Sequence, residues 1–214
     1  MKLRTLILGS LLFCLLWFLG WEAWAVFDAR QRTQQLFAPF GAEEQLDLTW
    51  NDLSHEKQNI LIQVEDPAFF SHRGVDMRTP GAGGATITQA LAKRLYFEKF
   101  TPGFAKIEQS LIALLVIDPV VAKEVQLNAF LSVAYFGDDV EGFSDAARSY
   151  FGKSIQNLDR PEFIRLVGAL VGPNHYKPGT PANEARAVRI ARFLRGECAP
   201  SSIRDVLYET CENP

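Results

Sequence analysis

The chain has 214 residues, which is enough for one domain plus an anchor and too few for two full domains. Hydrophobic residues make up 48% and charged residues 22%, the composition of a globular protein with a sizeable core, which argues against a disordered chain. The net charge of −3 supplies no basic face, so a nucleic-acid partner is not expected.

The N-terminal residues have the pattern of a membrane anchor. An apolar run follows Lys2 and Arg4, is interrupted at Glu22 and resumes as far as Phe27. A stretch of about 22 residues can cross a hydrocarbon core of ~30 Å as one helix. Basic residues ahead of such a helix keep the N-terminus in the cytoplasm and place the rest of the chain outside. Residues 1–27 are therefore predicted to be a single transmembrane anchor.

A cleaved signal peptide is the alternative for this segment, with Ala23-Trp24-Ala25 as its cleavage site. Trp17, Trp21 and Trp24 favour the anchor, because a cluster of bulky indoles suits a membrane interface better than a cleavage region. Both alternatives deliver the body of the protein to the same compartment.

Helical spacing dominates the rest of the chain. Residues 28–45 are polar and mixed, and they are predicted to form a juxtamembrane connector in which Pro39 and Gly41 break any long helix. Ser54 is a candidate N-cap for the first helix of the body. Period-2 alternation is scarce, so we predict an all-α, mainly helical body. Its helices are expected over residues 54–64, 85–97, 104–117, 120–134 (introduced by Pro119), 145–152, 161–171 and 183–194.

Three cysteines are present, and Cys14 lies in the apolar run. Cys198 and Cys211 lie near the C-terminus, where an oxidising envelope would permit a disulfide that closes a short loop. Two unrelated thiols are the alternative, because geometry decides whether two cysteines can pair. No metal site is expected from this cysteine spacing and three histidines.

One segment carries a specific motif. Residues 65–76 read E-D-P-A-F-F-S-H-R-G-V-D. They contain every fixed position of E-D-x-x-F-x-x-H-x-G-x-D, the first motif of the family 51 peptidoglycan glycosyltransferases. The chain therefore resembles this family of transglycosylases.

The second and third motifs of that family are altered in this chain. Residues 83–93, G-G-A-T-I-T-Q-A-L-A-K, resemble G-G-S-T-I-T-Q-Q-L-A-K except at Ala85 and Ala90. The third motif, R-K-x-x-E, keeps its lysine alone: Ala105 stands in place of the arginine and Gln109 in place of the glutamate.

The resemblance covers about residues 45–195, including Y-F-G at 135–137 and Y-F-G-K at 150–153. It implies a lysozyme-like glycosyltransferase fold, with a large lobe, a small membrane-proximal lobe and a cleft between them. We therefore expect a glycosyltransferase-like domain over residues 46–195, followed by a C-terminal segment at 196–214.

The resemblance also implies partners and a location. The expected substrates are the lipid-linked disaccharide precursor (lipid II) and the growing glycan strand at the membrane, and other cell-wall synthesis proteins are further candidate partners. The body would face the periplasm, or the outside, from a bacterial inner (cytoplasmic) membrane. No cofactor is assigned; the one candidate is a divalent cation, Mg²⁺ or Mn²⁺, at the pyrophosphate.

The family reaction joins lipid-linked disaccharides with inversion at the anomeric carbon. It needs a base near the acceptor hydroxyl and cations near the leaving pyrophosphate. The resemblance makes Glu65 the base, and the neighbouring Asp66 carboxylate would raise the pKa of Glu65 toward the working pH. Asp66 and His72 are candidate substrate-binding residues, although His72 is expected chiefly to hold its loop through a hydrogen bond.

A polar face is expected on the helix of the second motif. Thr86, Gln89 and Lys93 stand three and four residues apart, so on a helix they would share one face and form a polar cleft wall that binds substrate. Lys93 could meet a phosphate, and Lys106 could add a second cation. A solvated face without a ligand is the alternative.

Gln109 takes the catalytic position of the family's second glutamate, which supports the leaving pyrophosphate. A neutral amide is a weaker support, and loss of one such electrostatic group costs ~10²–10³ in rate. Glu108 is not expected to replace it, because one residue along a helix turns the side chain by about 100°.

Three functions remain open at this point. The first is a working peptidoglycan glycosyltransferase, which the intact first motif, the anchor and Lys93 support. The second is a catalytically degenerate relative that binds lipid-linked precursor, glycan or the cell-wall synthesis machinery as a regulator. The third is a glycan hydrolase, which would need two separated carboxylates.

Overall fold

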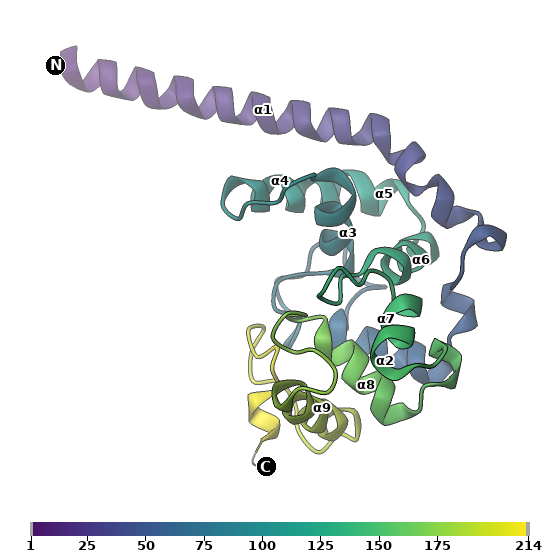
Figure 1. Cartoon of the computed structure of the whole chain (residues 1–214). Helices are drawn as coiled ribbons and strands as arrows, with labels where there is room; N and C mark the ends of the chain where they lie inside the picture. Colours follow the sequence, from purple (N-terminus) through teal and green to yellow (C-terminus); the bar gives the residue numbers. More distant parts are fainter. Residues whose placement is uncertain (1, 213–214) are drawn as a thin grey trace.

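The structure is a computed structural model that describes residues 2–212 (Figure 1). The described residues form helices and short turns, joined by loops, with one isolated antiparallel bridge between Tyr135 and Glu141. The prediction of an all-α fold is confirmed. The α-helices are α1 (Lys2–Gly41), α2 (His55–Glu65), α3 (Ile87–Tyr96), α4 (Phe104–Ile112), α5 (Asp118–Val120), α6 (Lys123–Val133), α7 (Phe143–Phe151), α8 (Arg160–Ala169) and α9 (Pro181–Leu194). The short elements are the 3₁₀ turns η1 (Glu43–Gln45), η2 (Trp50–Asp52), η4 (Ile155–Asn157) and η5 (Glu209–Cys211), and the π-helical η3 (Ala113–Ile117).

Helix α1 runs through both the predicted anchor and most of the predicted connector. The prediction that Pro39 breaks the helix is wrong, because α1 continues to Gly41. Proline removes one main-chain N–H, and here the lost hydrogen bond falls in the last turn, where few further bonds depend on it. The connector of residues 28–45 is therefore mainly helical.

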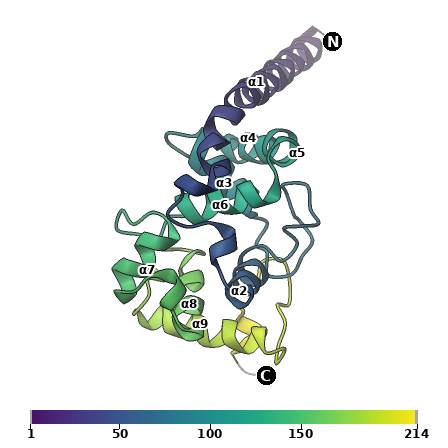
Figure 2. The same cartoon turned by 90° about the vertical axis from the view of Figure 1, so that its right-hand side faces the viewer.

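The N-terminal end of α1 projects from the body as a straight rod (Figures 1 and 2), and Phe18 is packed on Phe104 of α4, with ring centroids 5.5 Å apart. Its apolar side chains are exposed, for example Leu6 and Trp17 at 70% and 69%. Among the described residues this is the one helix long and apolar enough to cross a membrane by length and composition. A signal sequence meets the same criterion, so the cleavage alternative stays open.

The C-terminal half of α1 belongs to the body. Ala29 and Phe37 are buried in the core. The Thr33 hydroxyl lies 2.8 Å from the Tyr96 hydroxyl of α3, which ties the two helices together. The anchor is thus continuous with the fold rather than joined to it by a loop.

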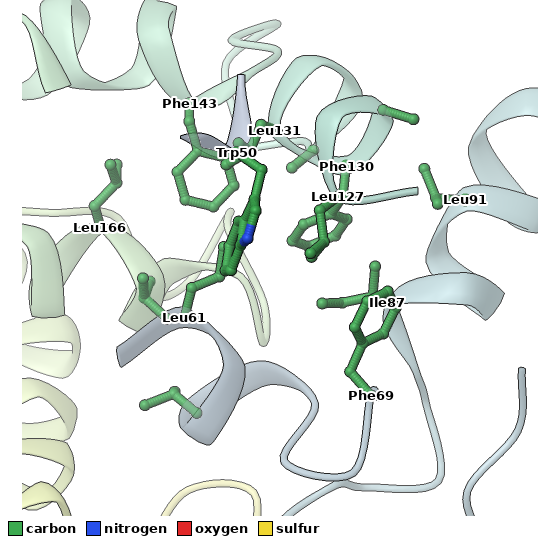
Figure 3. Packing of buried hydrophobic residues seen from close by; sticks show 14 of the residues in the cluster. Trp50, Leu61, Phe69, Ile87, Leu91, Leu127, Phe130, Leu131, Phe143 and Leu166 are labelled. Atoms are coloured by element: carbon green, nitrogen blue, oxygen red, sulfur yellow. The ribbon is translucent and has the colours of Figure 1, made fainter. Parts of the chain in front are cut away.

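The body forms two groups of helices around one core. Helices α4 and α6 and the π-helical η3 contact α1, and α3 packs on α4 and α6, whereas α2, α7, α8 and α9 lie farther from α1 (Figures 1 and 2). Figure 3 shows Trp50 among side chains from both groups, including Ile87 of α3, Leu61 of α2 and Phe143 of α7. The arrangement agrees with a small membrane-proximal lobe and a larger lobe.

Two predicted helix boundaries differ from the structure. The helix expected over residues 104–117 consists of α4 followed by π-helical η3. It continues without a break into the short α5, which contains Pro119, so Pro119 does not start a new helix. The chain becomes extended at Val121, and Ala122 is the N-cap of α6. Proline is tolerated in the first turn of a helical piece, so it marks a start only when the preceding residues are not helical.

The C-terminal segment is closed by a disulfide. Cys198 and Cys211 are bonded, with their Cα atoms 5.4 Å apart, a spacing within the normal range for such a bridge. Tyr208 of this segment is 1% exposed and packs on Phe193 of α9, with ring centroids 4.8 Å apart. The segment is therefore part of the folded domain.

Candidate active site

Glu65 is the last residue of α2, and it lines a pocket of about 170 Å³. Ser54 caps the start of this helix by accepting a hydrogen bond from the Lys57 N–H, as predicted for Ser54. Within the described chain the lining holds one carboxylate, Glu65, and two cations, Lys93 and Arg94. The pocket is lined by Glu65, Ala90, Lys93, Arg94, Phe130, Val133, Ala134, Tyr135, Leu170 and Pro173.

The electrostatic environment of Glu65 suits a proton acceptor. The pKa of Glu65 is raised from 4.5 to about 7: burial raises it, the Arg186 charge opposes the rise, and the Asp66 charge adds to it. Burial, rather than the neighbouring carboxylate expected from the sequence, is the largest cause. No hydrogen bond from the described residues holds the carboxylate. Glu65 can therefore accept a proton near neutral pH.

Asp66 and His72 hold the loop together instead of facing the pocket. Asp66 is fully buried, and the His72 Nε2 lies 3.0 Å from both of its oxygens. Asp66 also accepts a hydrogen bond of 2.9 Å from the Ile87 N–H at the start of α3. The predicted structural role of His72 is confirmed. The predicted contact of Asp66 with substrate is wrong in this conformation, because both its oxygens face protein.

The side chains of Thr86 and Gln89 are used by the helix itself. Thr86 is the N-cap of α3, not part of its face, and it forms a capping box with Gln89. Its hydroxyl also donates to the Gly74 carbonyl at 2.6 Å, and Gln89 donates to the Ser110 hydroxyl at 2.9 Å. Both residues are nearly fully buried, at 2% and 1% exposure. The prediction of a polar wall shared by Thr86, Gln89 and Lys93 is therefore wrong except at Lys93.

Two lysines provide positive charge, Lys93 in the Glu65 pocket and Lys106 in the groove next to it. Lys93 is exposed in the Glu65 pocket, with its Nζ 5.2 Å from the ring centre of Phe100. Partial burial and the nearby Lys93 charge lower the pKa of Lys106. Lys106 lies on the wall of a neighbouring, mainly apolar groove of about 400 Å³. That groove is lined by Val75, Met77, Gly84, Gln89, Lys106, Ile107, Ser110, Leu111 and Leu114.

Gln109 is buried between helices and does not line the Glu65 pocket. It is 3% exposed, and its Nε2 donates to the Gln89 carbonyl of α3 at 2.6 Å. Its Oε1 has no hydrogen-bond partner among the described residues. The expectation that this position faces the cleft is wrong here, because the amide has found a main-chain acceptor that a carboxylate could not use.

Glu108 lies toward α1 and does not replace the missing glutamate, as predicted. Burial raises the pKa of Glu108, and the Arg32 charge of α1 opposes the shift. The side of the site that the third motif should supply is consequently without a carboxylate from either position 108 or 109.

A larger pocket of about 240 Å³ between α8 and α9 does not compete with the Glu65 pocket. Its arginines each pair with a glutamate. These arginines are Arg160, Arg165 and Arg195. In the Glu65 pocket Arg94 likewise pairs with Glu141, at 2.8 Å, but Lys93 forms no ion pair with another described residue.

Sequence reasoning missed two groups near Glu65. Arg94 follows Lys93 directly and lines the same pocket, and a basic pair near a helix end could have suggested it. Arg186 is 2% exposed and carries a positive charge close enough to oppose the pKa shift of Glu65. Its burial had no sequence signal, because Arg189 and Arg192 of the same helix are the same residue type and are only partly buried.

A family model described as "Transglycosylase" matches residues 33–195 of the chain. The chain belongs to the transglycosylase family. The match covers the whole candidate site and begins in the last turns of α1.

Several curated relatives are penicillin-binding proteins. Penicillin-binding protein 1A of Streptococcus pneumoniae strain ATCC BAA-255 / R6 is 30% identical over 159 residues, covering 67% of this chain and 22% of the relative. Penicillin-binding protein 1B of Vibrio cholerae is 31% identical over 164 residues, covering 69% and 21%. Penicillin-binding protein 2a of Streptococcus pneumoniae serotype 2 is 35% identical over 136 residues, covering 59% and 18%. The match spans about a fifth of the length of each relative.

The residues of this chain do not fit a divalent cation beside position 109. The donor there is an amide, and the nearby charges belong to Lys93 and Lys106. Within residues 2–212 no cluster of three or more His, Cys, Asp or Glu side chains could hold a metal ion. Paired ammonium groups repel a divalent cation and attract a pyrophosphate, so we derive no step through a metal.

Proposed function

We propose that this transglycosylase is a membrane-anchored peptidoglycan glycosyltransferase that uses Glu65 as its base. The observation that carries the proposal is the Glu65 carboxyl, whose pKa is raised to about 7 in a pocket that also contains Lys93 and Arg94. A base with a pKa near the working pH transfers protons most effectively.

The proposed reaction joins an acceptor glycan to a lipid-linked disaccharide. The acceptor hydroxyl oxygen forms a bond to the anomeric carbon of the donor, and Glu65 takes the hydroxyl proton. The bond from that carbon to the pyrophosphate oxygen breaks, and the pyrophosphate leaves with the electron pair. Lys93 and Lys106 compensate its charge as point cations. Attack from the face opposite the leaving group inverts the anomeric configuration.

The altered third motif is expected to weaken this reaction. Ala105 removes the planar, bidentate contact that an arginine makes with phosphate, and lysine does not reproduce it. Gln109 contributes no charge. Each missing group is expected to lower the rate by ~10².

A second candidate function is binding of lipid-linked precursor or glycan without polymerisation. The observation that favours it is Gln109, whose amide is committed to the Gln89 carbonyl. Such a protein would act on the cell-wall synthesis machinery as a regulator. A glycan hydrolase is less well supported, because the described pocket lining holds one carboxylate instead of two.

The proposed location follows from α1 and its flanking charges. The helix would cross the inner membrane of a bacterium once and place the body in the periplasm or outside. The lipid-linked donor would then reach the site from the membrane surface beside α1.

Polymerisation of labelled lipid-linked disaccharide by the full-length protein tests the proposal. Glu65→Gln keeps the shape of the side chain but cannot take the proton, so product formation should fall by ~10²–10⁴. Glu44→Gln is the matched control, because Glu44 is exposed on η1 and its substitution should leave the rate unchanged.

The outcomes separate the two candidates. Glycan made by the parent and by Glu44→Gln, but not by Glu65→Gln, supports the enzyme. Binding of the donor by the parent without any glycan rejects the polymerase and supports the regulator.

A further inference from the structure

The C-terminal segment, residues 197–212, packs behind the Glu65 pocket and holds the loop of the second motif. The Gly81 N–H donates to the Ser202 carbonyl at 2.9 Å, and the Gly83 N–H donates to the Ile203 carbonyl at 2.6 Å. The main-chain N–H groups of this loop therefore donate to carbonyl oxygens near the C-terminus of the chain.

The contact at Gly83 is close enough to require glycine. Gly83 has a φ of +67°, and an added Cβ would lie 2.5 Å from the Val206 Cγ1. A side chain at this position would be strained by its backbone conformation and would clash with the segment. The loop and the C-terminal segment are therefore fitted to one another.

Tyr208 of the segment reaches the end of α2. Its hydroxyl donates to the Val64 carbonyl at 3.2 Å, immediately before Glu65 in the chain. The ring is fully buried against Phe193 of α9. Tyr208 can therefore fix the last turn of α2, from which Glu65 enters the pocket.

Val206 of the segment holds the buried cation behind Glu65. Arg186 of α9 donates to the Gly168 carbonyl at 2.7 Å and to the Val206 carbonyl at 3.0 Å. Its guanidinium carbon lies 5.9 Å from the ring centre of Tyr208. The charge of Arg186 thus keeps its place relative to Glu65 through contacts with the C-terminal segment.

We propose that residues 197–212 are a positioning element for Glu65, in which Tyr208 holds the end of α2, Val206 holds Arg186 and the Cys198–Cys211 disulfide keeps both in place. This inference rests on the proposed function of Glu65 as the base. The segment acts through Glu65 and touches neither substrate nor the reacting atoms.

Charged and titratable groups from several parts of the chain surround Glu65. Asp66 follows it in the chain, and Lys93 and Arg94 come from α3. Arg186 comes from α9 and Tyr208 from the segment, and Tyr135 lines the same pocket just after α6. Burial is the largest cause of the raised pKa of Glu65. Opening the segment would admit water behind α2, which lowers that pKa, and would loosen Arg186, which raises it. Because burial is the larger of the two causes, the net shift is downward.

The test compares oxidised and reduced full-length protein in detergent, in a Cys14→Ser background so that the disulfide alone responds. The readout is the pH dependence of carbodiimide modification at Glu65, followed by mass spectrometry without any substrate. The oxidised protein should show half-modification near the pKa of about 7. Reduction and alkylation of Cys198 and Cys211 should move this midpoint down by about one unit, toward the ordinary value of glutamate.

Two variants keep the test independent of global unfolding. Tyr208→Phe keeps the buried ring and removes the hydrogen bond to Val64, so it should move the midpoint in the same direction by a smaller amount. In an active preparation it should lower kcat and leave KM within about twofold. Glu209→Gln alters an exposed residue of the same segment and should change neither quantity.

An unchanged Glu65 midpoint after both reduction and Tyr208→Phe would overturn the inference, even if the reduced protein melts at a lower temperature. The segment would then stabilise the fold without positioning Glu65. Because the modification assay needs no catalysis, a protein that makes no glycan would reject the proposed polymerase while leaving this measurement decisive.

Discussion

The two sides of the candidate site differ in how much of the family's chemistry they retain. On the first-motif side, Glu65 has a raised pKa, and Asp66 and His72 fasten its loop to α3. On the third-motif side, the polar group at position 109 is a buried amide, and position 105 is alanine. The difference shows that the chain can keep its base while the groups that support the leaving group are reduced. The base lies on α2, whereas positions 105 and 109 lie on α4.

The largest expected effect is the pH dependence of glycan synthesis, which tests Glu65 on the first-motif side. Glu65 must be deprotonated to act as a base, and its pKa is about 7. The rate kcat/KM should therefore rise about tenfold per pH unit below neutrality and level off above it. A steady-state assay between acidic and mildly alkaline pH measures this. A rate that is flat through neutrality would contradict the assignment of Glu65 as the base.

The structural part of the first-motif side can be tested at Asp66. The buried Asp66 carboxylate contacts the His72 ring and accepts a hydrogen bond from the Ile87 N–H. Asp66→Asn would replace one of its oxygens with an NH2 group, which cannot accept a hydrogen bond. The free energy of unfolding should fall by about 3 kcal/mol, as measured by denaturant titration.

Asp47→Asn is the matched control for that substitution. Asp47 forms an exposed ion pair with Arg148, at 65% and 58% side-chain exposure. Its loss should cost no more than about 0.5 kcal/mol. Equal losses for the two variants would show that the buried cluster does not hold the loop.

The third-motif side can be tested by restoring the family residue. Gln109→Glu would remove the donor to the Gln89 carbonyl and bury a charge beside it. We expect a loss of about 2 kcal/mol in stability and no gain in product over the parent. A gain in glycan synthesis would mean that the side chain turns into the cleft and that this position alone had disabled the site.

The smallest expected effect is that of chelation. Lys93 and Lys106 carry the positive charge near the proposed pyrophosphate position, and the residues there do not fit a divalent cation. Product formation with EDTA should match that in magnesium or manganese within about twofold, because lysine ammonium groups, rather than a metal ion, would neutralise the pyrophosphate. A strict metal requirement would show that another arrangement of ligands forms with the donor bound.

Much of the fold and part of the site could be predicted from the sequence. Periodic apolar residues located the body helices, and Ser54 is the N-cap of α2 as predicted. The pairing of Cys198 with Cys211 was one of two alternatives and is formed. The first motif identified Glu65 and the family, because those residues stand at fixed spacing within a short stretch.

Tertiary structure decided which polar side chains face the pocket. Their spacing predicted that Thr86 and Gln89 share one helix face with Lys93. In the structure Thr86 is the N-cap of α3, and its hydroxyl donates to the Gly74 carbonyl. Gln109 has the position of a catalytic residue in the sequence, and its amide is turned to α3.

The sequence by itself determined the helices, the anchor candidate, the family and the residue that can act as base, since each depends on residues close together in the chain. Only the tertiary structure decided that Arg186 is buried behind Glu65 and that Val206 and Tyr208 hold that region. Periodicity identifies an amphipathic helix but not its neighbours. Burial of a charge and acceptance of a hydrogen bond depend on groups more than a hundred residues away, as between Tyr208 and Val64.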